Sequence, residues 1–123
     1  MKIERFEDIE SWKAGRELTK VIYNLTGKTS FNKDFGLKDQ IQRASISITA
    51  NIAEGFDSKS NKAFINFLNY SFRSASEIQS LIYAAIDQDY ISKDEFNKVY
   101  DKCTEVKKLI GGFIRYLKNN TNR

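Results

Sequence analysis

The sequence predicts an all-α protein that folds as a single domain over residues 1–123, an antiparallel up-down-up-down four-helix bundle. Turn-forming residues divide the chain into four helical blocks, and two of these blocks carry apolar residues at unbroken, alternating spacings of three and four. That spacing keeps one side of each helix facing its neighbours, as in a bundle. The connections of roughly four to nine residues favour antiparallel neighbours.

The first half of the chain contains two of the predicted helices. The first spans residues 8–26, with Asp8 as its N-cap and Gly27 as its C-terminal stop. The connector 27–34 is rich in turn-forming residues. The second helix spans residues 36–54 and ends at Gly55, which we expect in a left-handed conformation.

The second half carries the two strongest apolar patterns. The third helix spans residues 61–87, and its stripe consists of Phe64, Leu68, Ser71, Ala75, Ile78, Ile82 and Ala85. The fourth opens with Ser92 and Glu95, whose spacing predicts a capping box. Its stripe consists of Phe96, Val99, Cys103, Val106, Ile110, Phe113 and Leu117, which predicts a buried cysteine. Gly111 and Gly112 lie inside this helix and favour close approach of another helix or, alternatively, a local kink.

The two middle helices carry more apolar surface than one bundle needs. The second has a second apolar face at Ile46, Ala50 and Ala53, and the third is apolar around roughly 220° of its circumference. Apolar surface of this extent marks a contact with another protein, so we expect a homo-oligomer. The alternative is a monomer in which the terminal segments, including Ile3 and Phe6, cover the extra surface.

A polar seam separates the two apolar faces of the second helix. It consists of Gln40, Arg43, Ser47, Asn51 and Glu54, and Ser74 and Glu77 of the third helix are its expected partners. We expect a hydrogen-bond network that fixes the register of the helices and includes an Arg43–Glu77 pair. The alternative is a cleft that holds an anion or the side chains of a partner.

The composition excludes several classes of enzyme. The chain has no histidine and one cysteine, which excludes nucleophiles paired with histidine, histidine-ligated metals and thiolate zinc clusters. We therefore expect no catalytic residue, no metal, no cofactor and no small-molecule substrate. There is no signal-peptide pattern and no apolar run of about 20 residues, so we expect a cytoplasmic protein with no membrane contact.

The basic residues near the end of the chain form a candidate nucleic-acid surface. Residues 107–123 contain no acidic residue. The basic residues of this stretch are Lys107, Lys108, Arg115, Lys118 and Arg123. Such a surface would bind the phosphate backbone of RNA, and the alternative is a solvated helix end, where cations are also favoured.

The second predicted helix carries a family resemblance. The run 35–44, the pair Ser47–Ile48 and the run Asn-Ile-Ala-Glu-Gly at 51–55 resemble the four-helix-bundle family of 23S rRNA intervening-sequence proteins. Further similarity covers about residues 6–117, including Phe6 to Trp12, Phe67–Leu68, Ser74 and Glu77. The chain departs from the family pattern at Asn32 and Thr49, near which proline is common, and at Arg73, where glycine is common.

The resemblance implies a small bacterial protein that forms a ring-like homo-oligomer, a pentamer, and it brings no catalytic activity. A related basic bundle is an accessory protein of diversity-generating retroelements, where it partners a reverse transcriptase and RNA. The predicted function is therefore a non-enzymatic oligomeric scaffold that binds RNA, a protein–RNA complex or a nucleic-acid-processing protein. The alternative is a protein–protein adaptor with no nucleic-acid contact.

Overall fold

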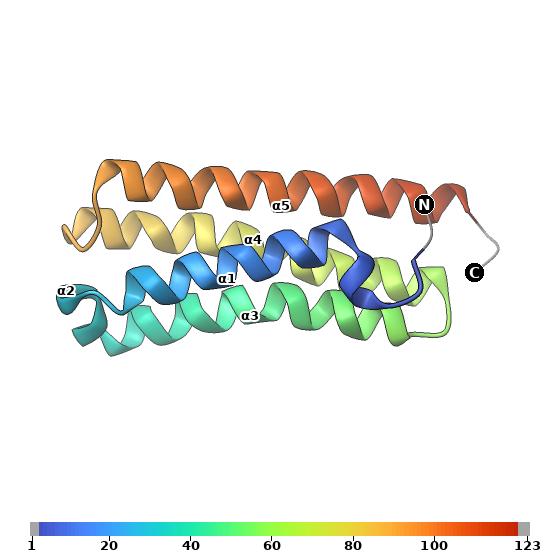
Figure 1. Cartoon of the computed structure of the whole chain (residues 1–123), viewed down its shortest axis with the longest axis horizontal. Helices are drawn as coiled ribbons and strands as arrows, with labels where there is room; N and C mark the ends of the chain where they lie inside the picture. Colours follow the sequence, from blue (N-terminus) through green and yellow to red (C-terminus); the bar gives the residue numbers. More distant parts are fainter. Residues whose placement is uncertain (1–2, 121–123) are drawn as a thin grey trace.

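The computed structural model describes residues 3–120, and within this range all regular structure is helical. Four long helices lie side by side, and their connections alternate between the two ends of the molecule (Figure 1). The helices are η1 (Phe6–Asp8), α1 (Glu10–Thr26), α2 (Thr29–Lys33), α3 (Phe35–Asp57), α4 (Asn61–Asp87) and α5 (Lys93–Asn119). The principal contacts join α1 to α3 and α5, and α4 to α3 and α5. The all-α prediction is confirmed, and the arrangement is that of a helical bundle.

The start of α1 differs from the sequence prediction. Asp8 belongs to the short helix η1, and Ile9 is the residue that precedes α1. The Asp8 carboxylate accepts a hydrogen bond from the Glu4 backbone N–H at 3.1 Å and lies 3.5 Å from the Arg5 guanidinium. These contacts lower the pKa of Asp8, the Glu4 N–H contributing most. Asp8 thus stabilises the turn before α1 and does not cap that helix.

The connector after α1 contains a short helix, α2, that the sequence analysis did not predict. Gly27 does end α1, but in a right-handed conformation with φ −80°. On α2, the Phe31 ring is fully buried and stacks on Tyr90, with ring centroids 5.3 Å apart. The Tyr90 hydroxyl donates to the Asp34 carboxylate at 2.9 Å, which raises the pKa of Tyr90. Asp34 also accepts from the Leu37 N–H and so caps α3. The connector therefore closes one end of the core.

Gly55 has a different role from the predicted one. Helix α3 continues past it to Asp57, and no glycine between residues 3 and 120 has a positive φ. A Cβ atom on Gly55 would lie 2.6 Å from Cδ1 of Phe64 and 2.9 Å from Cβ of Phe67. Gly15 similarly faces Ile48, whose Cγ2 would lie 2.9 Å from an added Cβ. Both glycines therefore allow α3 to lie very close to a neighbouring helix.

The predicted apolar stripes of α4 and α5 form much of the core. All seven residues of the α4 stripe are buried, as are six of the seven on α5, and Phe96 is partly buried. Cys103 is fully buried, and desolvation raises its pKa to about 12. The thiolate is the reactive form of cysteine, so this thiol is an inert part of the core.

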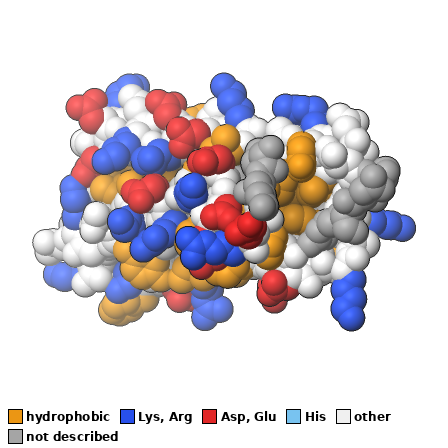
Figure 2. Space-filling view, turned by 45° about the vertical axis from the view of Figure 1, so that its right-hand side comes forward, with side chains coloured by type: hydrophobic (Ala, Val, Ile, Leu, Met, Phe, Trp, Pro, Cys, Tyr) orange, Lys and Arg blue, Asp and Glu red, His pale blue; other side chains and the backbone are white. Residues whose placement is uncertain are grey.

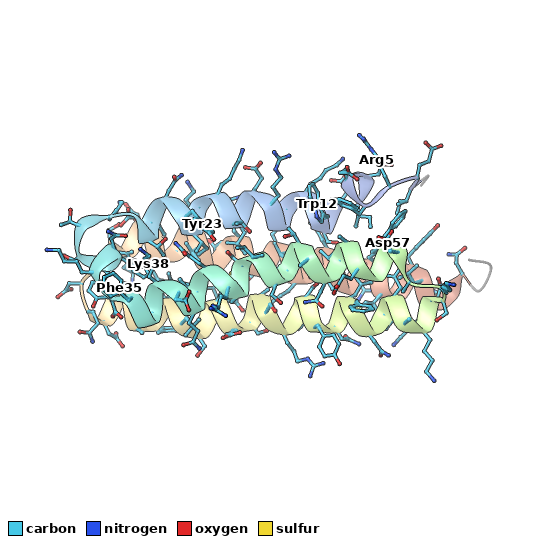
Figure 3. All side chains as sticks on the ribbon, turned by 90° about the horizontal axis from the view of Figure 1, so that it is seen from below. Arg5, Trp12, Tyr23, Phe35, Lys38 and Asp57 are labelled. Carbon is cyan, nitrogen blue, oxygen red and sulfur yellow. The ribbon has the colours of Figure 1, made fainter. Side chains whose placement is uncertain are left out.

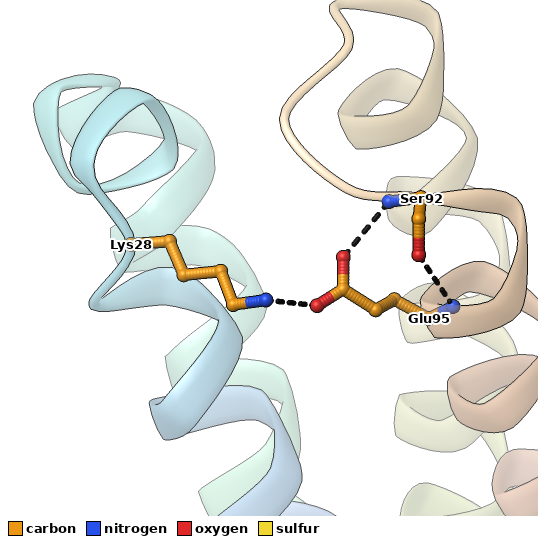
Figure 4. A network of polar contacts seen from close by, with 3 residues as sticks. All are labelled: Lys28, Ser92 and Glu95. Atoms are coloured by element: carbon orange, nitrogen blue, oxygen red, sulfur yellow. Dashed lines mark hydrogen bonds and ion pairs between the residues drawn. The ribbon is translucent and has the colours of Figure 1, made fainter.

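The predicted capping box at the start of α5 is confirmed. The Ser92 N–H donates to the Glu95 carboxylate at 2.8 Å, and the Glu95 N–H donates to the Ser92 hydroxyl at 3.1 Å (Figure 4). Lys28, between α1 and α2, pairs with the other carboxylate oxygen of Glu95. The Lys28 contact is the main reason that the pKa of Glu95 is lowered, and the Ser92 N–H adds to it. One carboxylate therefore both caps α5 and joins it to the α1–α2 corner.

Candidate functional site

The centre of the polar seam is a small hydrogen-bonded cluster between α3 and α4. The Ser74 hydroxyl lies 3.0 Å from the Ser47 hydroxyl oxygen. The Asn51 amide donates to the Ser47 carbonyl at 2.8 Å and to its hydroxyl at 2.9 Å. These three residues satisfy one another across the helix interface, which suits a network that fixes helix register.

The outer members of the seam are arranged differently from the prediction. The expected Arg43–Glu77 pair is not formed, because Arg43 pairs with Asp39, one turn earlier on α3, at 2.9 Å. Gln40 instead donates to the Glu77 carboxylate at 3.2 Å. Glu54 is exposed, about 21 Å along α3 from Gln40 at 1.5 Å per residue. Arg43 and Glu54 are eleven residues apart on α3, about 16 Å along the helix.

Two segments without acidic residues lie side by side at one end of α4 and α5. Residues 58–76 and 106–120 contain no Asp or Glu, and the two segments lie together because α4 and α5 pack against each other. One contact between the two segments is the hydrogen bond that the Asn61 amide on α4 donates to the Leu117 carbonyl on α5, at 3.1 Å. The basic residues of the two segments are Lys59, Lys62, Arg73, Lys107, Lys108, Arg115 and Lys118. All of them except Lys59 and Arg73 line depressions between the two helices, and Arg73 lies over the Tyr70 ring. Arg123, the remaining predicted member, lies outside the described residues.

The sequence analysis identified only the α5 half of this surface. Lys62 lies on α4, forty-five residues before the first α5 member, Lys107, so no local pattern joins the two helices' contributions. The sequence did contain one signal for the α4 half, which is the absence of acidic residues between Asp57 and Glu77.

Two depressions lie along this surface between α4 and α5, and we call them together the basic groove. Its wider part, about 530 Å³, is lined by Lys107, Lys108, Arg115, Gly111 and Phe72, together with Thr104. The Lys107 ammonium lies 5.0 Å from the centre of the Phe72 ring and 3.1 Å from Oε1 of Gln79. A cation is thus held over an aromatic ring, an arrangement worth about 0.5–1 kcal/mol where exposed.

The basic groove continues toward the end of the bundle. A second depression of about 420 Å³ is lined by Lys62, Ile65 and Asn66 of α4 and by Leu117 and Lys118 of α5, with Asn61 at its end. Lys107 and Lys118 are eleven residues apart on α5, which corresponds to about 16 Å of helix. The groove is long enough to contact more than one phosphate of a nucleic acid.

The glycine pair on α5 does not bring another helix of this chain close. A Cβ atom on Gly111 or Gly112 would lie 3.8 Å from a guanidinium nitrogen of Arg115, an ordinary contact. Helix α5 continues unbroken from Lys93 to Asn119. The prediction of close helix approach is therefore wrong within this chain, and the glycines leave the backbone of α5 open beside Arg115.

Exposed apolar side chains form two further surfaces. On the α1–α3 side, Trp12, Arg16, Tyr23 and Ile46 line a depression of about 400 Å³, along with Thr19, Lys20 and Thr49. Tyr23 and Ile46 are 43% and 46% exposed. Figure 3 shows Trp12 and Tyr23 along α1, and Figure 2 shows hydrophobic side chains reaching the surface between charged groups. On α4, Tyr70 is 51% exposed beneath the Arg73 guanidinium.

The terminal segment covers part of this apolar surface. Phe6 packs edge-on against Trp12, with ring centroids 5.1 Å apart, and Ile3 also packs against the core. Tyr23 and Ile46 remain exposed, and so does Ala50. The terminal segment therefore does not account for the whole second apolar face.

Residues 3–120 contain no group of three or more His, Cys, Asp or Glu side chains placed to hold a metal ion. No helix in the same range has the length and apolar character needed to cross a membrane.

Comparison with known proteins identifies the family. The family model described as 23S rRNA-intervening sequence protein matches residues 7–112. A crystal structure of a protein of unknown function from the S23 ribosomal protein family of Bacteroides thetaiotaomicron superposes with a TM-score of 0.78. The two chains are 26% identical, and the match covers 85% of this chain and 95% of that one. No curated protein matches. The chain therefore belongs to the family of 23S rRNA-intervening sequence proteins.

Proposed function

We propose that this protein is a non-enzymatic homo-oligomeric scaffold, built on an antiparallel up-down-up-down bundle, that binds RNA through the basic groove. The observation that carries the proposal is the packing of two acid-free segments, from α4 and α5, around cation-lined depressions, one of which includes the Phe72 ring beside Lys107. Cations that track a phosphate backbone, combined with an aromatic ring, are the common features of surfaces that bind single strands. The expected compartment is the cytoplasm, where RNA partners are found.

The two exposed apolar surfaces support the oligomeric part of the proposal. Tyr23 and Ile46 lie on the α1–α3 side, whereas Tyr70 lies on α4. Two different patches on one subunit suit a head-to-tail contact, which closes into a ring when the rotation allows it. A ring of five is the assembly that the family resemblance implies. Five copies of a +4 chain would carry +20, which strengthens attraction to RNA.

The assembly is tested by measuring mass in solution. We expect sedimentation or light scattering to give several times the mass of one chain. Ile46→Asp should shift the mass toward one chain, because it places a charge in the buried contact. Ala84→Asp, at an exposed apolar position near the end of α4, should leave the mass unchanged. A wild-type solution mass equal to that of one chain would show that Ile46 stays exposed to water and would contradict the proposed homo-oligomer.

RNA binding is tested by charge reversal in the basic groove. The double variant Lys107→Glu/Arg115→Glu should bind a structured RNA at least tenfold more weakly at about 100 mM salt. Its plot of log affinity against log salt should lose about two units of slope, about one for each phosphate contact. Lys93→Glu/Lys98→Glu makes the same charge change at the opposite end of α5 and should retain most of the affinity.

An equal loss of RNA affinity in the two double variants would show that affinity depends only on net charge. The basic groove would then not be the binding site. Absence of binding even at low salt would exclude RNA as a ligand. The protein–protein adaptor would then be the better function, and the depression lined by Trp12, Arg16 and Tyr23 would be its candidate surface.

A further inference from the structure

A second, more enclosed depression lies on the other side of α5, between this helix and the start of α1. Its volume is about 230 Å³, and Leu109, Phe113 and Tyr116 line it from α5. Ile3 and Ile9 close it from the N-terminal side. A cavity of roughly 150 Å³ accommodates a benzene molecule, so this pocket has room for one flat aromatic ring. Phe113 and Tyr116 stack on each other, with centroids 6.0 Å apart, and make one wall aromatic.

This pocket contains a polar group that lacks a partner. Ser11 lines it and is only 1% exposed, yet its hydroxyl has no hydrogen-bond partner among residues 3–120. A buried hydroxyl without a partner is costly, and such groups in native proteins call for an explanation. The hydroxyl oxygen is occluded in the free protein, so a ligand in the pocket reaches it when the Ser11 side chain turns toward the pocket. A ligand with a hydrogen-bonding edge would then satisfy the hydroxyl, which a purely apolar ligand would not do.

The ridge between this pocket and the basic groove carries almost no side-chain bulk. Lys108 lines both depressions, Gly111 lines the basic groove and Gly112 lines the pocket. Leaving aside the nearby backbone of α5 itself, a Cβ added to either glycine would have only the Arg115 guanidinium within 4 Å. The Arg115 guanidinium lies beside both glycines, so a ligand that crosses the α5 backbone here contacts this cation directly. Two cations flanking an open backbone are complementary to a phosphate.

We propose that the pocket takes one unstacked base of a single-stranded RNA, whose neighbouring phosphates cross the Gly111–Gly112 ridge into the basic groove. This proposal rests on the proposed RNA-binding function. Recognition of RNA sequence commonly uses unpaired bases that stack on aromatic side chains and hydrogen-bond through their edges. Here Tyr116 supplies the aromatic surface and Ser11 supplies a hydrogen bond.

The acidic edge of the pocket indicates which bases it accepts. Glu10 lines the side opposite α5, and its carboxylate lies 3.5 Å from the Lys13 ammonium. A carboxylate only accepts hydrogen bonds, and in base recognition it pairs with an amino group such as N4 of cytosine. Uracil has carbonyl oxygens and no amino group. The pocket should therefore favour a base with an amino group, and cytosine over uracil.

The test compares oligo(C) with oligo(U) of equal length, because both present the same phosphates to the basic groove. The wild-type protein should bind oligo(C) about tenfold more tightly, the size of effect that one base contact gives. Glu10→Ala should remove most of this difference, because it deletes the acceptor for the amino group of cytosine. Ser11→Ala should weaken binding of both oligonucleotides without lowering the melting temperature, because it deletes a hydroxyl that is unpaired in the free protein. Gly112→Leu should also remove the difference by filling the pocket, whereas Gly111→Ala, on the other side of the ridge, should keep it.

Equal binding of the two oligonucleotides by the wild-type protein, or a preference for oligo(C) that survives in both Glu10→Ala and Gly112→Leu, would overturn the base pocket. The proposed function would still stand in that case if the Lys107→Glu/Arg115→Glu variant loses affinity. A fall in solution mass caused by Gly112→Leu would show that another subunit occupies the pocket, and this result too would overturn the proposal. Absence of any RNA binding would remove both proposals together.

Discussion

Replacing Phe31 with alanine should lower the free energy of unfolding by about 3–5 kcal/mol, the usual cost of deleting a large buried aromatic side chain. The Phe31 ring is fully buried on α2 and stacks on Tyr90, which is itself hydrogen-bonded to Asp34. The substitution would leave a cavity at the point where the connector closes the core. Urea or thermal denaturation measures the effect.

Phe35 provides a matched control for this experiment. It lies four residues later and is 73% exposed, with the Lys38 ammonium 5.8 Å from its ring (Figure 3). Phe35→Ala should change stability by no more than about 0.5 kcal/mol, as is usual at the surface. Equal losses of stability in Phe31→Ala and Phe35→Ala would contradict the buried position of Phe31 in the core.

Gly55→Ala should destabilise the protein although alanine favours helix. Its methyl group would lie 2.6 Å from Cδ1 of Phe64, and Phe64 is itself buried. Overpacking of this kind costs about 1–3 kcal/mol, and larger clashes cost more. The gain in helix propensity, about 1 kcal/mol, is therefore offset or exceeded. The midpoint of denaturant unfolding should fall.

Gly111→Ala is the matched control, because the expected change in stability has the opposite sign. The same substitution in α5 meets only the Arg115 guanidinium at 3.8 Å, so it should raise stability by up to about 1 kcal/mol. An increase in both variants would mean that α3 and α4 separate enough to accept the methyl group, and the close approach at Gly55 would be wrong.

The long helices could be predicted from the sequence because their apolar spacing repeats over many turns. The stripe on α4, from Phe64 to Ala85, is buried at every position. The connector was harder to interpret, because residues 27–34 carry local turn signals while Phe31 is fixed by contact with Tyr90, 59 residues later. Gly55 shows a related limit, since a glycine near a helix end can either terminate the helix or accommodate a neighbour.

The candidate sites depended on which helices become neighbours. The α5 cations form one short acid-free stretch, so the sequence indicated them, whereas Lys62 joined the surface only through the packing of α4 against α5. The Arg43–Glu77 pair was a reasonable expectation between adjacent helices. A nearer carboxylate, Asp39, competes for the same guanidinium on its own helix.

The chain enters and leaves the bundle at one end, since Ile3 borders the pocket beside Tyr116 (Figure 1). An affinity tag or immobilisation linker joined near Ile3 or Asn120 would therefore lie at the same end of the bundle as both surfaces proposed to bind RNA. A fluorophore is better attached at Gln88, exposed in the turn between α4 and α5, about 40 Å away along the 27-residue α5. Because Cys103 is the one natural cysteine and is fully buried, a Gln88→Cys protein would take a maleimide dye at a single position in its native state.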